Sequence, residues 1–275
     1  MNRSGALYIE RDSFFHRLDG SVKLLMLVAW SAFVFMFMDL RIFGGLIVAG
    51  AWLLYLSKLP FRAMKPLIIL VMVFTFFNSL FLILVTPEYG SQLAGRRTVA
   101  LQLWGVGLTW ETLCFALTLS LKYLAILPIT LLFLLTTHPS SFAGSLNRLG
   151  VPYQVAYAVN IALRYIPDVH EEVQTIIHAQ EARGVEFQKG EAGILRRLRN
   201  YGTVLLPLLV TSLHRVEVVS NAMDLRGFGK HPARTWYSRK PLTRQDLMAA
   251  LGSLLLVGVG LYLRKRGLGK FWVIG

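Results

Sequence analysis

Long apolar stretches separated by short charged segments fill the first half of the chain and return near its end. A membrane-spanning helix needs about 20 mostly apolar residues, with a usable range of roughly 17–25. Five stretches meet or approach that length, and we expect each to form a spanning helix: residues 22–38, 42–56, 66–85, 113–135 and 247–263. The pattern therefore predicts an all-α integral membrane protein with about five transmembrane helices.

The composition points to a lipid bilayer and away from nucleic acid. Of the 275 residues, 55% are hydrophobic, whereas soluble domains usually lie near 45–50%. The formal net charge is +14, but Lys and Arg avoid the apolar stretches. A nucleic-acid-binding protein would gather that surplus on one soluble face. Cys114 is the only cysteine, which excludes an internal disulfide and a Cys/His metal framework.

The basic residues orient the predicted helices. Three regions carry most of them: the N-terminal segment, the loop after the second stretch, and residues 136–246 with fourteen Lys and Arg. Cytoplasmic loops are enriched in these residues. We therefore expect a cytoplasmic N-terminus, which places all three regions inside. The basic tail that begins at Arg264 would then lie outside, against the rule, but we still expect the last stretch to cross.

The region between the fourth and fifth stretches is too long for a structureless loop. Its one continuous apolar run, residues 204–210, contains Pro207 and is too short to span. The periodicity predicts amphipathic helices over residues 140–149, 152–183 and 203–226. We expect a kink or break in the second at Pro167, and a polar connector at residues 189–200.

We therefore expect three consecutive parts. Residues 1–137 hold the N-terminal segment and four spanning helices, and residues 138–245 form a cytoplasmic module of long amphipathic helices. Residues 246–275 hold the last spanning helix and the basic tail.

The two long amphipathic helices end in the same pattern, Ala-x-acid-x-Arg-Gly, repeated 43 residues apart. The first copy contains Glu181, Ala182, Arg183 and Gly184, and the second contains Asp224, Leu225, Arg226 and Gly227. One interpretation is two well-capped helices, because Gly favours the left-handed cap and a cation suits the last turn. The other is that each Arg projects as a bidentate fork for carboxylates on a partner protein. Two such tips suit two similar partner subunits.

Several segments resemble the T component of energy-coupling-factor (ECF) transporters, the EcfT/CbiQ family. Residues 182–184 and 225–227 resemble its paired X-Arg-X motifs, although Leu225 stands where Ala is common. Residues 12–19 resemble its N-terminal signature. Residues 147–152 and 161–167 resemble the stretch that leads into the first coupling helix, with Arg164 and Pro167 in the second of these segments. The resemblance covers nearly the whole chain and is strongest over residues 138–229.

The resemblance implies a non-catalytic subunit in the cell membrane of a prokaryote. In that family, the paired motifs dock into grooves on two ABC ATPase subunits, which are identical or different. Their motion reaches a membrane-embedded, substrate-binding S component that takes up a vitamin or a transition-metal ion. Glu181, Asp224, Arg164 and Pro167 are then supporting residues of the coupling module. The chain has no Gly-x-x-x-x-Gly-Lys-Ser/Thr phosphate loop, and we expect no catalytic residue, cofactor or metal.

Two other classes of protein compete with this interpretation. An integral-membrane enzyme that modifies lipids or prenyl groups would bring clustered acids to a membrane face, and none of the 15 acids forms such a cluster at a predicted span end. A channel or secondary transporter tends to have repeated membrane halves. The only repeat found here is in the amphipathic helices.

A few isolated polar residues are weaker candidates. His138 and Ser140 resemble a nucleophile pair, but no acid is placed to orient it, and capping by Ser is the favoured interpretation. His170 and His178 are eight residues apart, which does not suit a shared metal ion. Lys122 lies within the fourth predicted span, where a charge is either functional or in polar contact with another helix.

Overall fold

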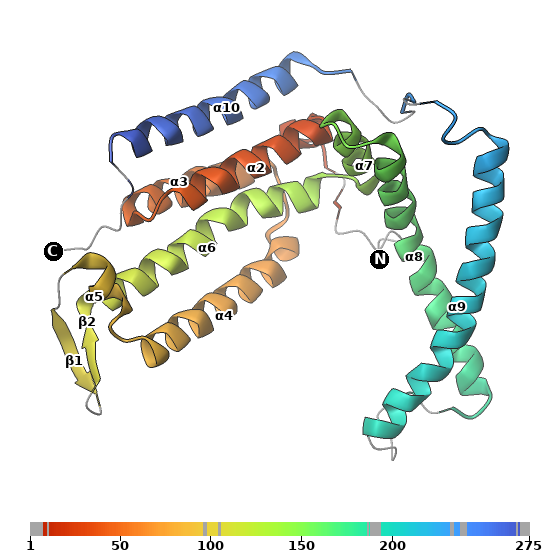
Figure 1. Ribbon diagram of the computed structural model, residues 1–275, viewed down its shortest axis with the longest axis horizontal. Coiled ribbons are helices and arrows are strands. Elements are labelled where there is room, and N and C mark those ends of the chain that lie inside the picture. The colour runs from red at the N-terminus through yellow and green to blue at the C-terminus, as the bar shows by residue number, and fades with distance from the viewer. Residues whose placement is uncertain are drawn as a thin grey trace. The chain divides into compact units, whose positions relative to one another are not determined.

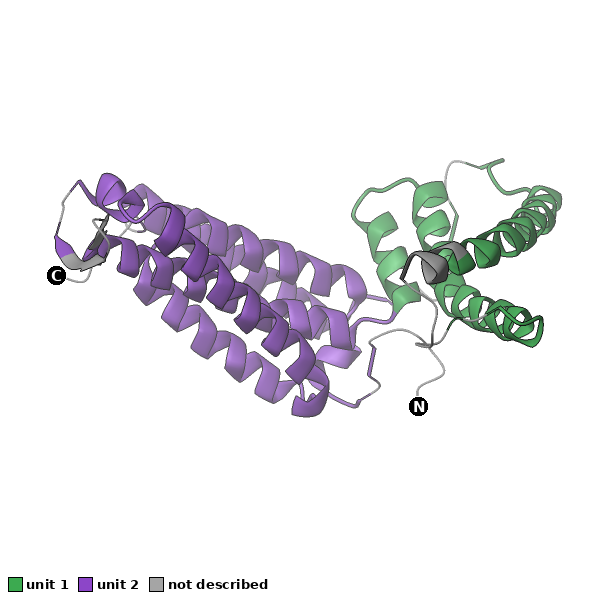
Figure 2. Cartoon of the chain, turned by 90° about the horizontal axis from the view of Figure 1, so that it is seen from below, with its two compact units in different colours: residues 1–6, 139–239 green, residues 7–138, 240–275 purple. Residues whose placement is uncertain are grey.

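The computed structural model describes residues 8–9, 11–95, 98–103, 106–185, 187, 194–231, 234–236, 241–267 and 269. The chain divides into two compact units, coloured separately in Figure 2. Residues 7–138 and 240–275 form one, which we call the bundle unit. Residues 1–6 and 139–239 form the other, which we call the crossed-helix unit.

The elements of the bundle unit are mostly long helices, in agreement with the predicted fold class. They are α1 (Phe14–Arg17), α2 (Gly20–Met36), α3 (Leu40–Leu56), α4 (Phe61–Val85), α5 (Tyr89–Ala94), β1 (Val99–Leu103), β2 (Val106–Thr109), α6 (Trp110–Thr136) and α10 (Arg244–Lys265). Helix α6 is central, because α2, α3, α4 and α5 all pack against it, and α10 packs against α2 (Figure 1). Phe37, Phe43 and Ile129 belong to the buried core between these helices.

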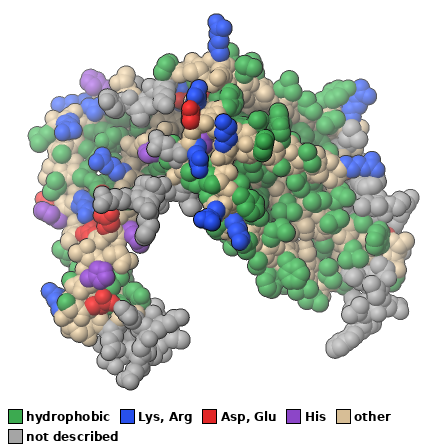
Figure 3. Space-filling view, turned by 180° about the vertical axis from the view of Figure 1, so that it is seen from behind, with side chains coloured by type: hydrophobic (Ala, Val, Ile, Leu, Met, Phe, Trp, Pro, Cys, Tyr) green, Lys and Arg blue, Asp and Glu red, His purple; other side chains and the backbone are tan. Residues whose placement is uncertain are grey.

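The outer surface of the bundle unit is apolar. Figure 3 shows hydrophobic side chains over a broad part of it. On α4 alone, Phe74, Phe76, Phe77 and Phe81 are all more than half exposed. Large contiguous apolar surfaces are rare on soluble monomers. Such a surface fits lipid, where the backbone of each helix is satisfied internally.

Each of the five predicted stretches corresponds to one observed helix, and the observed helices start two to five residues earlier. Four stretches lie within their helices, whereas residues 22–38 extend two residues beyond the end of α2 at Met36. By length and composition, α4, α6 and α10 are each long and apolar enough to span a membrane, whereas α2 and α3 are shorter, at 17 residues each. Helix α4 starts five residues before Pro66, because Arg62 and Lys65 form part of its polar beginning. Proline is tolerated near a helix start.

A short antiparallel hairpin of β1 and β2 joins α5 to α6, in the segment that the pattern analysis treated only as a loop. Gly95 ends α5 with a left-handed φ of +66°, a conformation that glycine adopts without a steric penalty. This hairpin supplies the two strands described in the bundle unit, whose other elements are helices.

The crossed-helix unit consists of α7 (Pro139–Arg148), α8 (Tyr153–Ala182) and α9 (Ile194–Leu225). Helices α8 and α9 are antiparallel and cross in Figure 1. At the end where the chain passes from α8 to α9, the ring centres of Phe187 and Tyr201 lie 5.5 Å apart. At the other end, Tyr157 near the start of α8 lies 5.1 Å from Phe228, just beyond the end of α9.

The structure differs from two expectations about these helices. Of the kink or break expected at Pro167, the break is absent, because α8 continues through this residue. Proline removes only one backbone hydrogen bond, and the rest of the long helix is retained. Helix α9 begins at Ile194, so the second half of the expected polar connector is helical. Residues 194–199 read Ile-Leu-Arg-Arg-Leu-Arg, and Leu and Arg are strong helix formers.

Residues Asn200–Leu225 of α9 also meet the length and composition of a membrane span, although the apolar run at 204–210 is short. Their mean hydropathy, 1.4, is the lowest among the four described helices that qualify. Arg215 of α9 forms an ion pair with Glu172 of α8. Helix α8 does not meet the length and composition of a membrane span. A bilayer around α9 would also have to accept the charges of α8, which is costly. The pairing therefore favours a position outside the hydrocarbon.

Candidate functional site

The first arginine tip, residues 181–184 at the end of α8, forms a Schellman motif. Gly184 has a φ of +85°, as predicted for a glycine cap. Its N–H donates to the carbonyl of Glu181 at 2.9 Å, and the N–H of Val185 donates to the carbonyl of Gln180 at 3.0 Å. This bond pair is the signature of the motif. Arg183 is the C-cap residue of α8.

The second tip repeats the same geometry at the end of α9. Gly227 has a φ of +67°. Its N–H donates to the carbonyl of Asp224 at 2.9 Å, and the N–H of Phe228 donates to the carbonyl of Met223 at 3.0 Å. Arg226 therefore occupies the same position in the motif as Arg183. The repeated sequence pattern therefore corresponds to a repeated backbone structure.

Both arginine side chains are exposed. Neither makes a hydrogen bond or ion pair with any residue in the described part of the chain. Ala182 is exposed, and Leu225 is 90% exposed. Each tip thus presents a planar guanidinium fork on a fixed backbone, which suits bidentate recognition of a carboxylate.

The two tips lie at opposite ends of the crossed pair, because α8 and α9 are antiparallel. A 2.7 Å ion pair joins Glu172 to Arg215 between the helices. Glu172 lies eleven residues before Arg183, and Arg215 lies eleven residues before Arg226. At about 1.5 Å per residue, each tip is roughly 16 Å along its helix from this ion pair.

The supporting residues are not all at the tips. Glu181 is next to the first tip and lies 3.3 Å from Nδ1 of His178, and Asp224 is exposed at the second. Arg164 and Pro167 lie in the first half of α8. They are more than about 20 Å along the helix from Arg183, given the rise per residue. The structure therefore does not bring them together with the first tip.

The comparisons with known proteins agree on one family. The family model CbiQ, described as "Cobalt transport protein", matches residues 11–237. The chain belongs to this family. It is similar to the energy-coupling factor transporter transmembrane protein EcfT of Brevibacillus brevis, at 30% identity over 91% of this chain and 94% of that relative. EcfT of Lacticaseibacillus paracasei is 30% identical over 94% of this chain and 97% of its own. EcfT of Lactococcus lactis subsp. cremoris is 27% identical over 90% of this chain and 93% of its own.

This CbiQ-family chain is therefore the T component of an ECF transporter, and it is a multi-pass membrane protein of a prokaryote. The resemblance on the arginine motifs and the N-terminal signature identified the family correctly.

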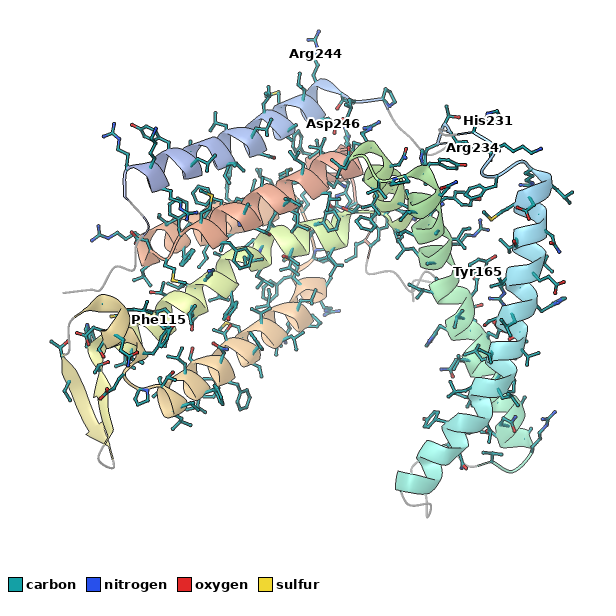
Figure 4. All side chains as sticks on the ribbon, viewed as in Figure 1. Phe115, Tyr165, His231, Arg234, Arg244 and Asp246 are labelled. Carbon is teal, nitrogen blue, oxygen red and sulfur yellow. The ribbon has the colours of Figure 1, made fainter. Side chains whose placement is uncertain are left out.

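The second tip of this CbiQ-family chain is anchored by residues that the sequence did not single out. Nη2 of Arg234 donates to the carbonyls of Arg226 and Gly227, at 2.9 and 3.0 Å. Figure 4 shows Arg234 between the end of α9 and the first turns of α8. Phe228 packs against Tyr153 and Tyr157 at the start of α8. The ring contacts join segments that are some 70 residues apart, so no local pattern indicates them. Arg234 lies only eight and seven residues beyond Arg226 and Gly227.

The N-terminal signature of the family connects the start of the bundle unit to the end of α6. The N–H of Ile9 donates to the carbonyl of Leu135 at 3.0 Å, and the buried Lys23 ammonium donates to that of Thr136 at 2.7 Å. His16 bonds the Ile9 carbonyl through Nε2 at 2.9 Å. Burial lowers the pKa of His16, the Ile9 carbonyl raises it, and the Lys23 charge lowers it further, for a net decrease. Ile9 and Lys23, which flank the signature, thus hold the last turn of α6, and His16 of the signature holds Ile9.

The isolated polar candidates have ordinary surroundings. The ammonium of Lys122 lies 4.9 Å from the ring centre of Phe35 on α2, which is a polar contact with another helix. His138 packs against the ring of Tyr8. His170 and His178 are exposed. Over the residues that the structure describes, no three His, Cys, Asp or Glu side chains are grouped as metal ligands.

Proposed function

We propose that this T component couples two ABC ATPase subunits to a membrane-embedded, substrate-binding S component, for uptake of a vitamin or a transition-metal ion. The observation that carries the proposal is the pair of matching arginine tips at opposite ends of the crossed helices. The relatives are named as transmembrane proteins of energy-coupling factor transporters, which supports the proposal.

Each tip docks into a groove on one ATPase. The backbone of the tip is fixed by its Schellman bonds, so the arginine loses little freedom when it binds a carboxylate. The small Ala182 lets the first tip enter a narrow groove. Leu225 offers the second tip an apolar contact of its own.

The crossed helices act as a lever between the motor subunits and the membrane. Closure of the two ATPases moves both tips, and the ion-paired helices carry that motion to the S component, which tilts. The chain itself is not an enzyme in this scheme, and the partners bind and hydrolyse the nucleotide. The N-terminus and the crossed-helix unit lie in the cytoplasm.

Co-purification of the ATPase pair with Arg183→Ala, Arg226→Ala and the double variant tests the docking. Truncating one partner of a buried interfacial charge pair costs roughly 2–5 kcal/mol, so each variant should weaken retention at least about tenfold. Arg→Lys should rescue poorly, because an ammonium lacks the planar fork. Arg244→Ala, an exposed arginine at the start of α10, is the matched control. Full ATPase retention by the double variant would remove the proposal.

The alternative of a lipid- or prenyl-modifying membrane enzyme has no specific observation in its favour. It would also leave the matching geometry of the two tips without a role.

A further inference from the structure

A cavity of about 380 Å³ lies within the crossed-helix unit, between α7, the start of α8 and the segment that follows α9. Its size is within the range of ligand pockets, roughly 300–1,000 Å³. The lining combines aromatic rings with polar groups: Tyr157, Phe228 and Trp236, with Ser140, Tyr153, Asn160, Arg234 and Thr235. Arg234 and Thr235 are exposed, so the cavity reaches the surface.

Tyr153 is the first sign of a ligand. It lines the cavity and is only 6% exposed, and its buried hydroxyl has no hydrogen-bond partner among the residues that the structure describes. Buried polar groups in native proteins are nearly always hydrogen-bonded, so this hydroxyl calls for a polar partner in the cavity that it lines.

Arg234 supplies the charge. Its Nη2 bonds the two carbonyls that follow the second tip. Its Nε and Nη1 make no hydrogen bond with the residues that the structure describes. An anion in the cavity would therefore meet free guanidinium N–H groups and an unpaired phenolic hydroxyl. Guanidinium N–H groups and a phenolic hydroxyl are donors that suit phosphate oxygens.

Two walls of the cavity belong to segments that adjoin membrane-spanning helices in the sequence. Ser140 is four residues after the end of α6, and Trp236 is seven residues before Thr243, the N-cap of α10. Tyr and Trp favour the headgroup level of a bilayer.

We propose that this cavity binds the phosphate of a phospholipid headgroup, with Arg234 and Tyr153 as donors. The aromatic rings line the space around the glycerol part of the lipid. Because Arg234 also holds the carbonyls of Arg226 and Gly227, a bound lipid would connect the second tip to the membrane surface. The site does not depend on whether the tips dock on ATPases.

Native mass spectrometry of the purified full chain in detergent, titrated with phosphatidylglycerol, tests the proposal. Hydrogen bonds to charged groups contribute about 1.5–3 kcal/mol, so Arg234→Gln should weaken lipid binding roughly tenfold or more. Tyr153→Phe removes one hydroxyl without changing the ring and should weaken binding several-fold. Tyr165→Phe, on the same helix but outside this cavity, should bind lipid like the unaltered chain.

Two further titrations distinguish the source of the phosphate. Diacylglycerol with the same acyl chains lacks the phosphate and should bind much more weakly. Inorganic phosphate at the lipid's concentration should not displace phosphatidylglycerol. Equal binding of the lipid by all variants, or of diacylglycerol by the unaltered chain, would overturn the proposal. Displacement by inorganic phosphate would overturn the lipid as occupant and assign the site to the free anion. None of these outcomes bears on ATPase docking.

Discussion

The carboxylate of Glu172 on α8 accepts a 2.7 Å hydrogen bond from Nη2 of Arg215 on α9, at equal sequence distance from the two arginine tips. Both side chains are at least two-thirds buried, and the Arg215 guanidinium also lies over the ring of Tyr165, which Figure 4 labels on α8. The ion pair thus lies at the centre of two arms of equal length. This symmetry suits the proposed lever between two similar motor subunits.

Breaking the ion pair should loosen the crossed helices. We expect a coupling free energy of about 0.5–3 kcal/mol between Glu172 and Arg215 in a double-mutant cycle of Glu172→Ala and Arg215→Ala. Thermal unfolding in detergent measures the stability, and spin labels at residues 183 and 226 should report a broader distance distribution in each variant. Additive effects with an unchanged distribution would show that the pair does not hold the arms.

The glycine caps should be sensitive to any side chain. A non-glycine residue in the left-handed region costs roughly 1–2 kcal/mol, so Gly184→Ala and Gly227→Ala should fray the last turns. Hydrogen exchange at the amides of Val185 and Phe228 should then speed up about fivefold or more. An added Cβ at Gly184 meets no atom within 4 Å, and at Gly227 it meets only the flexible Lys230 side chain. The expected cost therefore comes from the backbone.

Gly202 provides the matched control for these substitutions. It lies inside α9, and an added Cβ there also meets no atom within 4 Å. Gly202→Ala should stabilise the helix, by up to about 1 kcal/mol. If all three glycines respond alike, the left-handed caps do not define the tips.

Acidification should weaken the attachment of the N-terminal segment to α6. The pKa of His16 is lowered from its ordinary value of 6.5, with burial as the largest cause, so the folded chain binds a proton at this ring less readily than the unfolded chain. The stabilisation from the neutral ring is complete above pH 6.5 and is lost as the pH falls toward the lowered pKa. The protection factor of the Ile9 amide, which corrects the hydrogen-exchange rate for its intrinsic pH dependence, should be smaller at pH 5.5 than at pH 7.5. In His16→Gln this difference should shrink, and an equal difference there would assign it to another group.

The Lys23 ammonium should contribute measurably to the stability of the bundle unit. Lys23 is only 3% exposed and bonds the last carbonyl of α6. Lys23→Met keeps the length of the side chain but leaves that carbonyl without this donor, at a cost of about 1–3 kcal/mol. The thermal midpoint in detergent should fall, whereas Lys65→Met at an exposed position of α4 should leave it nearly unchanged. Equal midpoints for both variants would contradict the role of Lys23.

The long helices of the bundle unit were predictable because each carries a long apolar run, whereas the continuous apolar run of α9 is short. Their boundaries were less predictable, since charged first turns, such as that of α4 with Arg62 and Lys65, do not extend an apolar pattern. The start of α9 was missed for the same reason, because its first turn carries arginines. A kink or break was expected at Pro167, and α8 continues through it.

The tips were found from the repeated pattern, because a glycine cap is a local feature of sequence. Their anchoring was not predictable. The contact of Phe228 with Tyr153 follows only once the antiparallel register of α8 and α9 is known. No sequence pattern pairs Arg234 with the carbonyls of Arg226 and Gly227. The equal spacing of the tips from the Glu172–Arg215 pair likewise depends on that register.

Site-specific cross-linking to the ATPases tests the central claim most directly. Cys114 is buried, so Ala182→Cys and Leu225→Cys place accessible thiols at the two exposed tips. Each single variant, assembled with its ATPases in membranes, should give an adduct of one chain with one ATPase, and the double variant should give one chain with two. Failure of either tip to cross-link an ATPase, or a double variant that never captures more than one, would contradict the account.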